Sequence, residues 1–203
     1  TLQKLRHEIP KKLLPIYKTD KRYIVLYGGR GSGKSIGIAD WLLLTGYKER
    51  YRILCTREIQ NSLAQSVHKL LCDRIEALHL KSFYNITDKA ITGKNGTEFF
   101  FRGLFANEDS IKSMQGITLA WVEESQSISR RSMEVLIPTI REEGSKIIFT
   151  LNPTNDDDAV YADFVLKDRD DCLKIEMNYD DNPFFPSVLR SEMEYCPARY
   201  VRM

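Results

Sequence analysis

The chain has 203 residues, 29% of them charged and 42% hydrophobic, and this balance excludes both a disordered chain and a membrane protein. Its longest apolar run, at residues 23–27, has five residues, whereas a membrane-spanning helix needs about 20. The net charge of +2 is too small to indicate a nucleic-acid-binding surface by itself, although residues 1–22 hold seven Lys or Arg against two Asp or Glu, a local charge of +5. We therefore expect a soluble, intracellular protein with one domain, or with one domain and a short appendage.

Strands and helices alternate along the chain. In chain order, the patterns predict a strand at 23–27, a helix at 35–44 that ends before Gly46, a strand at 52–55, a helix at 59–78, strands at 83–86, 90–92, 98–102 and 118–122, a helix at 131–141, a strand at 146–151, a helix at 156–166, a strand at 172–177 and a helix at 185–195. The helix at 59–78 has the clearest pattern, because its apolar residues fall at steps of three and four. Alternation of this kind favours a mostly parallel sheet covered by helices.

A glycine-rich loop follows the first predicted strand. The sequence GGRGSGKS at residues 28–35 satisfies the pattern G-x-x-x-x-G-K-S/T, in which glycines let backbone N–H groups turn inward around phosphates. Lys34 is expected to reach the β- and γ-phosphates of a nucleotide, and the Ser35 hydroxyl to bind magnesium. Because a buried strand precedes the loop and a helix follows it, the pattern indicates phosphate binding rather than a structural turn. The predicted nucleotide-binding residues are Gly28, Gly29, Arg30, Gly31, Ser32, Gly33, Lys34 and Ser35.

Two glutamates, Glu123 and Glu124, follow the strand predicted at 118–122. Glu123 would hold the magnesium shell through water, and Glu124 would orient and deprotonate the attacking water. The alternative is a pair of solvated glutamates that cap the next helix. Paired acids favour an ATPase with an extra strand between the loop strand and the acidic strand, over a GTPase or a small-molecule kinase.

A third polar element, Thr150 and Asn152, lies where the strand at 146–151 ends. A Thr or Asn at this strand tip would sense the γ-phosphate and couple its loss to motion. The alternative is an Asn-Pro pair at residues 152–153 that only terminates the strand.

Six segments occur in an order that resembles a known family. They are the loop at 28–35 with its internal arginine, ILCTREIQNS at 53–62, WVEES at 121–125, LIPTIR at 136–141, LNP at 151–153 and NYDDNP at 178–183. Together they resemble the ATPase domain of the large terminase subunit of tailed double-stranded DNA phages, from about residue 23 onward. The resemblance implies a RecA-like (ASCE) P-loop NTPase domain of the α/β class, with a mostly parallel sheet flanked by helices.

The resemblance also implies roles for single residues. Arg30 in the loop corresponds to an arginine that engages the γ-phosphate in cis, so the implied catalytic residues are Glu124, Lys34 and Arg30. A packaging motor is also expected to receive an arginine finger from a neighbouring subunit. Arg102 and Lys112 are the two candidates for that finger, and the residues do not decide between them.

The implied division of the chain has three parts. Residues 1–22 form a basic N-terminal leader on the adenine side, residues 23–178 the P-loop ATPase core, and residues 179–203 a C-terminal subdomain leading towards a nuclease domain. Adenine recognition is expected before the strand at 23–27, with no residue assigned. Arg57 is placed either to contact nucleotide or DNA, or to form a salt bridge at a helix start.

By resemblance, the chain is an ATPase motor that hydrolyses Mg-ATP, with ATP as substrate and Mg²⁺ as cofactor, to translocate viral DNA into a procapsid. The implied partners are double-stranded viral DNA, the portal ring, the small terminase subunit and further copies of the chain in a ring, with no membrane involved. The implied location is the host cell cytoplasm, transiently at the procapsid portal. Nuclease activity is not expected, because the chain stops near where the nuclease half would begin.

Two other functions compete with this interpretation. A helicase or DNA-repair ATPase would share the core, but 203 residues leave no room for a second helicase-like core. An ATP-gated assembly module with little turnover would bind nucleotide without hydrolysing it. The presence of Glu124 argues against that module.

Overall fold

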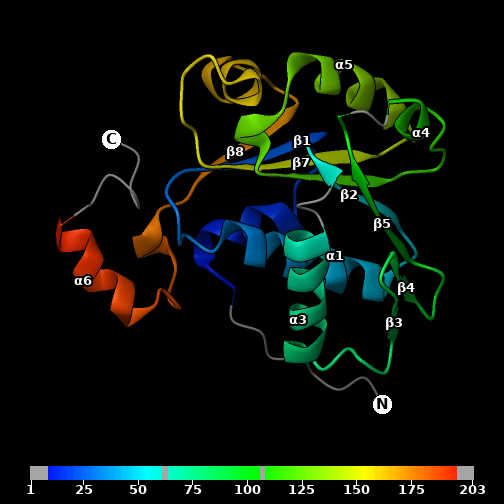
Figure 1. The fold of residues 1–203 in the computed structure, drawn as a ribbon, viewed down its shortest axis with the longest axis horizontal. Coiled ribbons are helices and arrows are strands. Elements are labelled where there is room, and N and C mark those ends of the chain that lie inside the picture. The colour runs from blue at the N-terminus through cyan, green and yellow to red at the C-terminus, as the bar shows by residue number, and fades with distance from the viewer. Residues whose placement is uncertain (1–8, 61–63, 106–107, 196–203) are drawn as a thin grey trace.

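Eight strands form one sheet in the computed structural model, which describes residues 9–60, 64–105 and 108–195 (Figure 1). The strands are β1 (Tyr23–Tyr27), β2 (Arg52–Arg57), β3 (Tyr84–Ile86), β4 (Ala90–Gly93), β5 (Glu98–Gly103), β6 (Leu119–Glu123), β7 (Lys146–Leu151) and β8 (Cys172–Glu176). Their order in the sheet is β3-β4-β5-β2-β6-β7-β1-β8. The strands from β5 to β8 in this order pair in parallel, whereas β4 pairs antiparallel with β3 and β5.

Helices cover both faces of this sheet. In chain order, the helical elements are η1 (Lys11–Tyr17), α1 (Lys34–Lys48), η2 (Ala64–His68), α3 (Lys69–Ala77), α4 (Glu108–Lys112), η3 (Ser125–Ser127), α5 (Arg130–Thr139), η4 (Tyr161–Leu166), η5 (Tyr179–Asp181) and α6 (Ser187–Tyr195). Figure 1 shows α1 and α3 below the sheet and α4 and α5 above it, with α6 beside the sheet. The chain is therefore an α/β protein with a mostly parallel sheet flanked by helices, and the predicted fold class is confirmed.

Strand β1 shows why the sheet needs a layer on each face. Ile24 and Leu26 belong to the core under α1, whereas Val25 belongs to the core on the opposite face. Such a strand reads as a continuous apolar run, because side chains alternate between two buried faces. Its carboxyl end leads directly into the glycine loop.

The extra strand expected between the loop strand and the acidic strand is β7. It pairs with β1 on one side and with β6 on the other. Glu123 lies opposite Thr150, and Tyr27 lies opposite Leu151. The carboxyl ends of three neighbouring strands thus meet at one edge of the sheet, which is where ligands bind in open α/β sheets.

The helix predicted at 35–44 is longer than expected, because Gly46 does not end it. Helix α1 continues to Lys48. A Cβ atom at Gly46 would lie 2.8 Å from Thr97 Cγ2 and 2.9 Å from the Tyr84 hydroxyl. The glycine therefore lets α1 pack closely against the β3–β5 region, and its role is close approach rather than termination.

The helix predicted at 59–78 is divided into η2 and α3 among the described residues. Ile59 lies in a bend and is 61% exposed, and the next residue, Gln60, is already helical. Leu63, which completed the pattern, lies outside the described residues. The pattern thus predicts the buried face of α3, formed by Leu71 and Ile75, but not the exposure of Ile59.

Three other predicted helices also differ in their boundaries. The helix predicted at 156–166 starts at Ala159, because the Asp158 carboxylate accepts hydrogen bonds from the N–H groups of Thr154 and Asn155 and closes a turn. The helix predicted at 131–141 spans 130–139, and the helix predicted at 185–195 starts at Ser187. The short helix α4 was not predicted.

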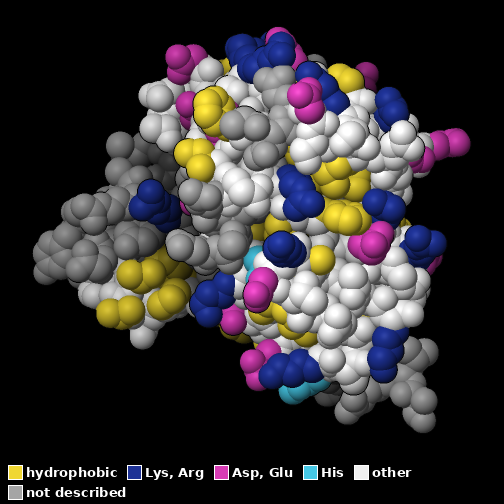
Figure 2. Space-filling view, turned by 45° about the vertical axis from the view of Figure 1, so that its right-hand side comes forward, with side chains coloured by type: hydrophobic (Ala, Val, Ile, Leu, Met, Phe, Trp, Pro, Cys, Tyr) yellow, Lys and Arg dark blue, Asp and Glu magenta, His cyan; other side chains and the backbone are white. Residues whose placement is uncertain are grey.

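Charged side chains of both signs are interspersed on the face drawn in Figure 2, as the small net charge leads one to expect. Hydrophobic side chains are exposed at the left of that view, where Figure 1 places α6. Phe184 and Val188 are 60% and 71% exposed. Within the part of the chain that the structure describes, no helix has the length and apolar character needed to cross a membrane.

Candidate nucleotide-binding site

The glycine loop joins β1 to the N-terminus of α1. Gly33 precedes the first residue of α1 with a φ of +84°, and Gly28 has a φ of +131°. A Cβ atom at Gly28 would lie 2.2 Å from the carbonyl oxygen of Met177, so only glycine fits there. The loop therefore presents backbone N–H groups at the positive end of a 15-residue helix, which is a favourable place for phosphate.

Lys34 lies buried inside the loop, with 6% of its surface exposed. Its Nζ donates hydrogen bonds to Gly29 O at 2.7 Å, to Ser32 Oγ at 2.8 Å and to Asn152 Oδ1 at 3.0 Å. Burial lowers the pKa of Lys34 to about 8, and the nearby Glu123 offsets part of this effect. The ammonium group thus stands where phosphates would approach the loop.

We expect the affinity for ADP to fall as the pH rises through about 8. With its pKa at about 8, the Lys34 amine becomes neutral above that pH and attracts phosphate less. If bound phosphate keeps the amine protonated, the Kd rises by up to roughly tenfold per pH unit well above this pKa. Calorimetric titration with ADP from about pH 7 to about pH 9.5 measures the effect. A Kd that stays constant over this range would contradict the role of Lys34.

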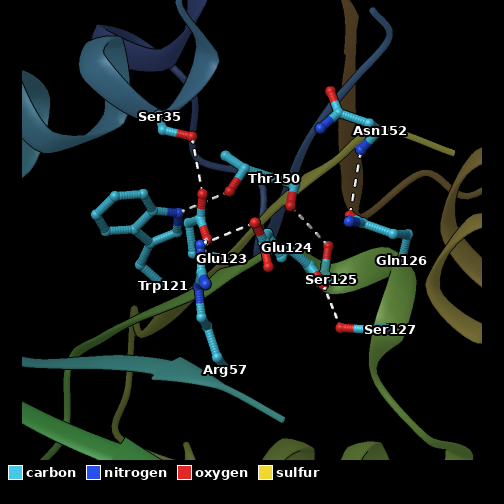
Figure 3. Close-up of polar contacts among 10 residues, drawn as sticks. All are labelled: Ser35, Arg57, Trp121, Glu123, Glu124, Ser125, Gln126, Ser127, Thr150 and Asn152. Carbon is cyan, nitrogen blue, oxygen red and sulfur yellow. Dashed lines mark hydrogen bonds and ion pairs between the residues drawn. The ribbon is translucent and has the colours of Figure 1, made fainter. Parts of the chain in front are cut away.

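The two glutamates at the end of β6 share one arginine partner (Figure 3). Glu123 Oε1 accepts a hydrogen bond from Ser35 Oγ at 3.1 Å, and Glu123 Oε2 accepts one from Arg57 Nε at 2.6 Å. The guanidinium of Arg57 also forms an ion pair with Glu124 at 3.0 Å. Burial raises the pKa of Glu123, and the Arg57 charge offsets part of that rise.

Glu124 has a backbone conformation that glutamate seldom adopts. Its φ is +52° and its ψ is +44°, in the left-handed region, at the start of η3. This conformation turns the chain at the end of β6, and the Glu124 side chain remains half exposed beside the buried Glu123. The two carboxylates thus differ: one faces Ser35 and the protein interior, and the other faces solvent.

Thr150 at the end of β7 and Asn152 just after it have different surroundings. The hydroxyl of Thr150 is buried and accepts a hydrogen bond from the Trp121 indole N–H at 3.0 Å, which links β7 to β6. Asn152, in contrast, contacts the loop through Lys34, and its backbone N–H donates to Gln126 Oε1 at 3.2 Å. Asn152 therefore joins the phosphate loop to the segment that follows the acidic pair.

These residues surround a cavity of about 460 Å³. It is lined by residues 30–36 of the loop and helix, by Glu123 and Glu124, by Gln126, and by residues 150–152. Arg30 is exposed at this cavity. Neither finger candidate lines it: Arg102 donates a hydrogen bond to the carbonyl of Phe101, and Lys112 ends α4.

A second cavity, of about 450 Å³, adjoins the first. Gly31, Gly33 and Ile36 line both cavities. The second cavity is mainly apolar, and residues 9, 10 and 17 of the segment before β1 contribute to it. Its polar corner is a buried ion pair in which Arg74 donates to both carboxylate oxygens of Asp40, at 2.6 and 3.0 Å.

Sequence reasoning left the role of Arg57 open and did not find four other residues. The structure pairs Arg57 with Glu123 and with Glu124, the residue that precedes η3. The indole of Trp121, the amide of Gln126, and the side chains of Asn178 and Asn182 also belong to the site. Asn178 and Asn182 lie in the segment NYDDNP, which contributed to the family resemblance but to which no function was assigned. This segment was the only sequence signal for the two asparagines.

A phosphate loop on one strand, an acidic pair on a second strand and a third strand between them define a RecA-like P-loop NTPase domain. The sequence profile of the phage terminase large subunit family matches residues 20–197, and the chain therefore belongs to that family. The PBSX phage terminase large subunit of Bacillus subtilis (strain 168) is 28% identical over 158 residues, covering 76% of this chain and 36% of that protein.

Solved structures of large terminases share this fold. The structure of a large terminase from a thermophilic bacteriophage has a TM-score of 0.78 at 16% identity, over 93% of this chain and 50% of that one. The same terminase in complex with ATP-gamma-S has a TM-score of 0.75 at 16% identity, and the match covers 92% of this chain and 49% of that one. The large terminase ATPase domain of Thermus phage P74-26 has a TM-score of 0.67 at 12% identity, and the match covers 96% of this chain and 92% of that one. This chain thus spans half or less of the first two relatives' length and almost all of an isolated ATPase domain.

Proposed function

We propose that this chain is the motor ATPase of a phage large terminase, which hydrolyses Mg-ATP to translocate viral DNA into a procapsid. The observation that carries the proposal is the cavity in which Lys34, Glu123 and Glu124 converge around the glycine loop. Family membership supports the same activity, and a relative of the same fold has been solved in complex with ATP-gamma-S.

The residues at this cavity fit a magnesium ion. Ser35 Oγ and Glu123 Oε1 lie 3.1 Å apart, and both are oxygen ligands of the kind that Mg²⁺ prefers. Two protein ligands are enough for Mg²⁺, because this ion usually keeps several of its waters. When bound, the ion would neutralise charge on the nucleotide phosphates.

The protein residues then divide the remaining work. Lys34 and the loop N–H groups stabilise charge on the transferred phosphoryl group, and Arg30 reaches the γ-phosphate from the exposed side of the cavity. Glu124 orients the attacking water and accepts its proton. The proposed sensor is Asn152, which would report the loss of the γ-phosphate to the segment after β6; its hydrogen bonds to Lys34 and Gln126 support this role.

The nucleoside would occupy the second, apolar cavity. That cavity adjoins the phosphate site, and Ile36 and Tyr17 provide surfaces against which a base can pack. Residues 9, 10 and 17 come from the segment before β1, in agreement with an adenine-side role for residues 1–22. The Asp40–Arg74 pair supplies the only charged side chains among the described residues that line this cavity.

The partners and the division of the chain follow from the motor role. The proposed partners are double-stranded viral DNA, the portal ring, the small terminase subunit and further copies of the chain, in the host cell cytoplasm. Residues 23–178 form the proposed ATPase core, and residues 179–203 the proposed C-terminal subdomain. No nuclease activity is proposed for this chain.

We expect ATP turnover per chain to rise with protein concentration in the presence of Mg²⁺. A finger donated by a neighbouring copy completes the site only in the assembly, because Arg102 and Lys112 do not line the cavity of their own chain. The substitutions Arg102→Ala and Lys112→Ala separate the two candidates. One of them should lower the concentration-dependent part of ATP turnover at least roughly tenfold. A Mg²⁺-dependent rate that is constant per chain and unchanged in both variants would contradict the trans finger, and absence of turnover at every concentration would contradict the ATPase proposal.

A further inference from the structure

The segment after β8 lies against the glycine loop and has no role in the hydrolysis described above. The Asn178 side chain accepts a hydrogen bond from the Gly29 N–H at 3.0 Å. The Asn182 side-chain amide donates one to the Gly31 carbonyl at 2.7 Å. Two asparagines thus bond the loop backbone on either side of Arg30, one as acceptor and one as donor. We call residues 178–185 the asparagine brace.

The brace is itself held in one conformation. Asn178 and Asp181 form reciprocal bonds between side chain and backbone at the ends of η5. Asn182 Oδ1 accepts a hydrogen bond from the Phe184 N–H at 3.0 Å. Asp181 also pairs with Lys12 of η1 at 2.8 Å, which ties the brace to the segment before β1. Both asparagine side chains are therefore oriented toward the loop by bonds that do not involve it.

The loop and the brace pack without spare room. A Cβ atom at Gly31 would lie 2.4 Å from the ring of Phe185, which is 5% exposed. A change in the shape of the loop at this point therefore requires movement of the brace.

The end of the brace and the residues that follow it reach the second cavity. Phe184, Pro186 and Leu189 line it together with Ile36 and Tyr17. A nucleotide whose phosphates lie in the loop and whose base lies in that cavity would contact the loop and residues 184–189 at the same time.

We propose that Asn178 and Asn182 are positioning residues that hold the glycine loop in its phosphate-accepting shape, so that nucleotide binding and docking of residues 178–189 on the loop stabilise each other. The inference rests on the proposed nucleotide site and adds a route by which nucleotide state reaches α6. Such coupling is reciprocal: docking strengthens nucleotide binding by the same factor by which bound nucleotide stabilises docking.

The opposite hydrogen-bond roles of the two asparagines provide a matched pair of variants. Asn178→Asp keeps an acceptor for the Gly29 N–H, whereas Asn182→Asp replaces a donor with a carboxylate that faces the Gly31 carbonyl. Both add one negative charge beside the loop. We expect Asn182→Asp to raise the Kd for ADP roughly tenfold or more, and Asn178→Asp to raise it several times less. Asn85→Asp, on an exposed residue of β3, is the control for a distant charge and should leave the Kd unchanged.

The measurements are calorimetric titration with ADP for each variant and hydrogen exchange of the wild type with and without ADP. ADP should slow exchange in residues 178–195 as well as in the loop, and this part does not depend on how any variant folds. Equal Kd values for the two Asp variants, or ADP protection confined to the loop, would overturn the brace while leaving the nucleotide site intact. A wild type that binds no ADP would overturn both proposals. A KM for ATP that rises in Asn182→Asp with kcat little changed would support positioning of the loop.

Discussion

Replacing Glu124 with glutamine should lower kcat for ATP by roughly 100-fold or more, because a general base contributes about 10²- to 10⁴-fold and an amide cannot accept the proton of the attacking water. The side chain of Glu124 is half exposed at the cavity and contacts Arg57 rather than Lys34. Nucleotide affinity should therefore change less than about threefold. Steady-state phosphate release gives kcat, and titration with ADP gives the affinity.

The matched control for this substitution is Glu134→Gln. Glu134 is an exposed glutamate on α5 and does not line the cavity at the glycine loop. The control should keep wild-type kcat. If Glu124→Gln retained more than about a third of the wild-type kcat, Glu124 would not be the base.

Replacing Arg57 with alanine should destabilise the fold and slow turnover together. Arg57 and Glu123 are 11% and 13% exposed at their side chains, so removal of the guanidinium leaves a buried carboxylate without its cationic partner. Breaking such a pair costs about 3 kcal/mol of the free energy of unfolding. The two glutamates would also repel each other without the shared cation, so we expect kcat to fall at least roughly tenfold.

The pH dependence of stability distinguishes the loss of the cationic partner of Glu123 from a simple loss of packing at Arg57. Burial already raises the pKa of Glu123, and the Arg57 charge opposes that rise, so the alanine variant raises it further. When a carboxyl group has a higher pKa in the folded than in the unfolded state, the protein loses stability as the pH rises between these two pKa values. The deficit of Arg57→Ala should thus be smaller at about pH 5 than at about pH 8, and Arg57→Lys should recover part of it. Urea unfolding at both pH values tests this, and a deficit independent of pH would point to packing alone.

The features that depend on a local sequence pattern were predicted correctly from the sequence. The apolar run of β1, the spacing of the glycine loop and the acidic pair after β6 each occupy a few consecutive residues, and they combine to predict a loop strand, an inserted strand and an acidic strand. The structure has these elements, with β7 inserted between β1 and β6. In a parallel sheet, loops at the carboxyl ends of neighbouring strands necessarily lie near one another, so their convergence also follows.

What the sequence could not predict are contacts between segments far apart in the chain. Arg57 and Glu123 are 66 residues apart, and nothing local at Arg57 indicates which carboxylate it meets. Gly46 resembled a helix stop, because the local sequence does not show that the Tyr84 hydroxyl, on another element, leaves no room there for a side chain. Ile59 continued a helical pattern, yet tertiary structure leaves it exposed in a bend. Propensity and periodicity are weak constraints where packing decides.

The claim that this cavity hydrolyses ATP is tested most directly by single-turnover cleavage of prebound, γ-labelled ATP. Wild type and Glu124→Gln would be loaded to the same occupancy at high protein concentration, and Mg²⁺ added to start the reaction, so that binding and product release do not enter. We expect the wild type to release its label as phosphate and the variant to retain intact ATP at least roughly 100 times longer. Equal release by both chains, or intact ATP on both, would contradict a hydrolytic site built on Glu124.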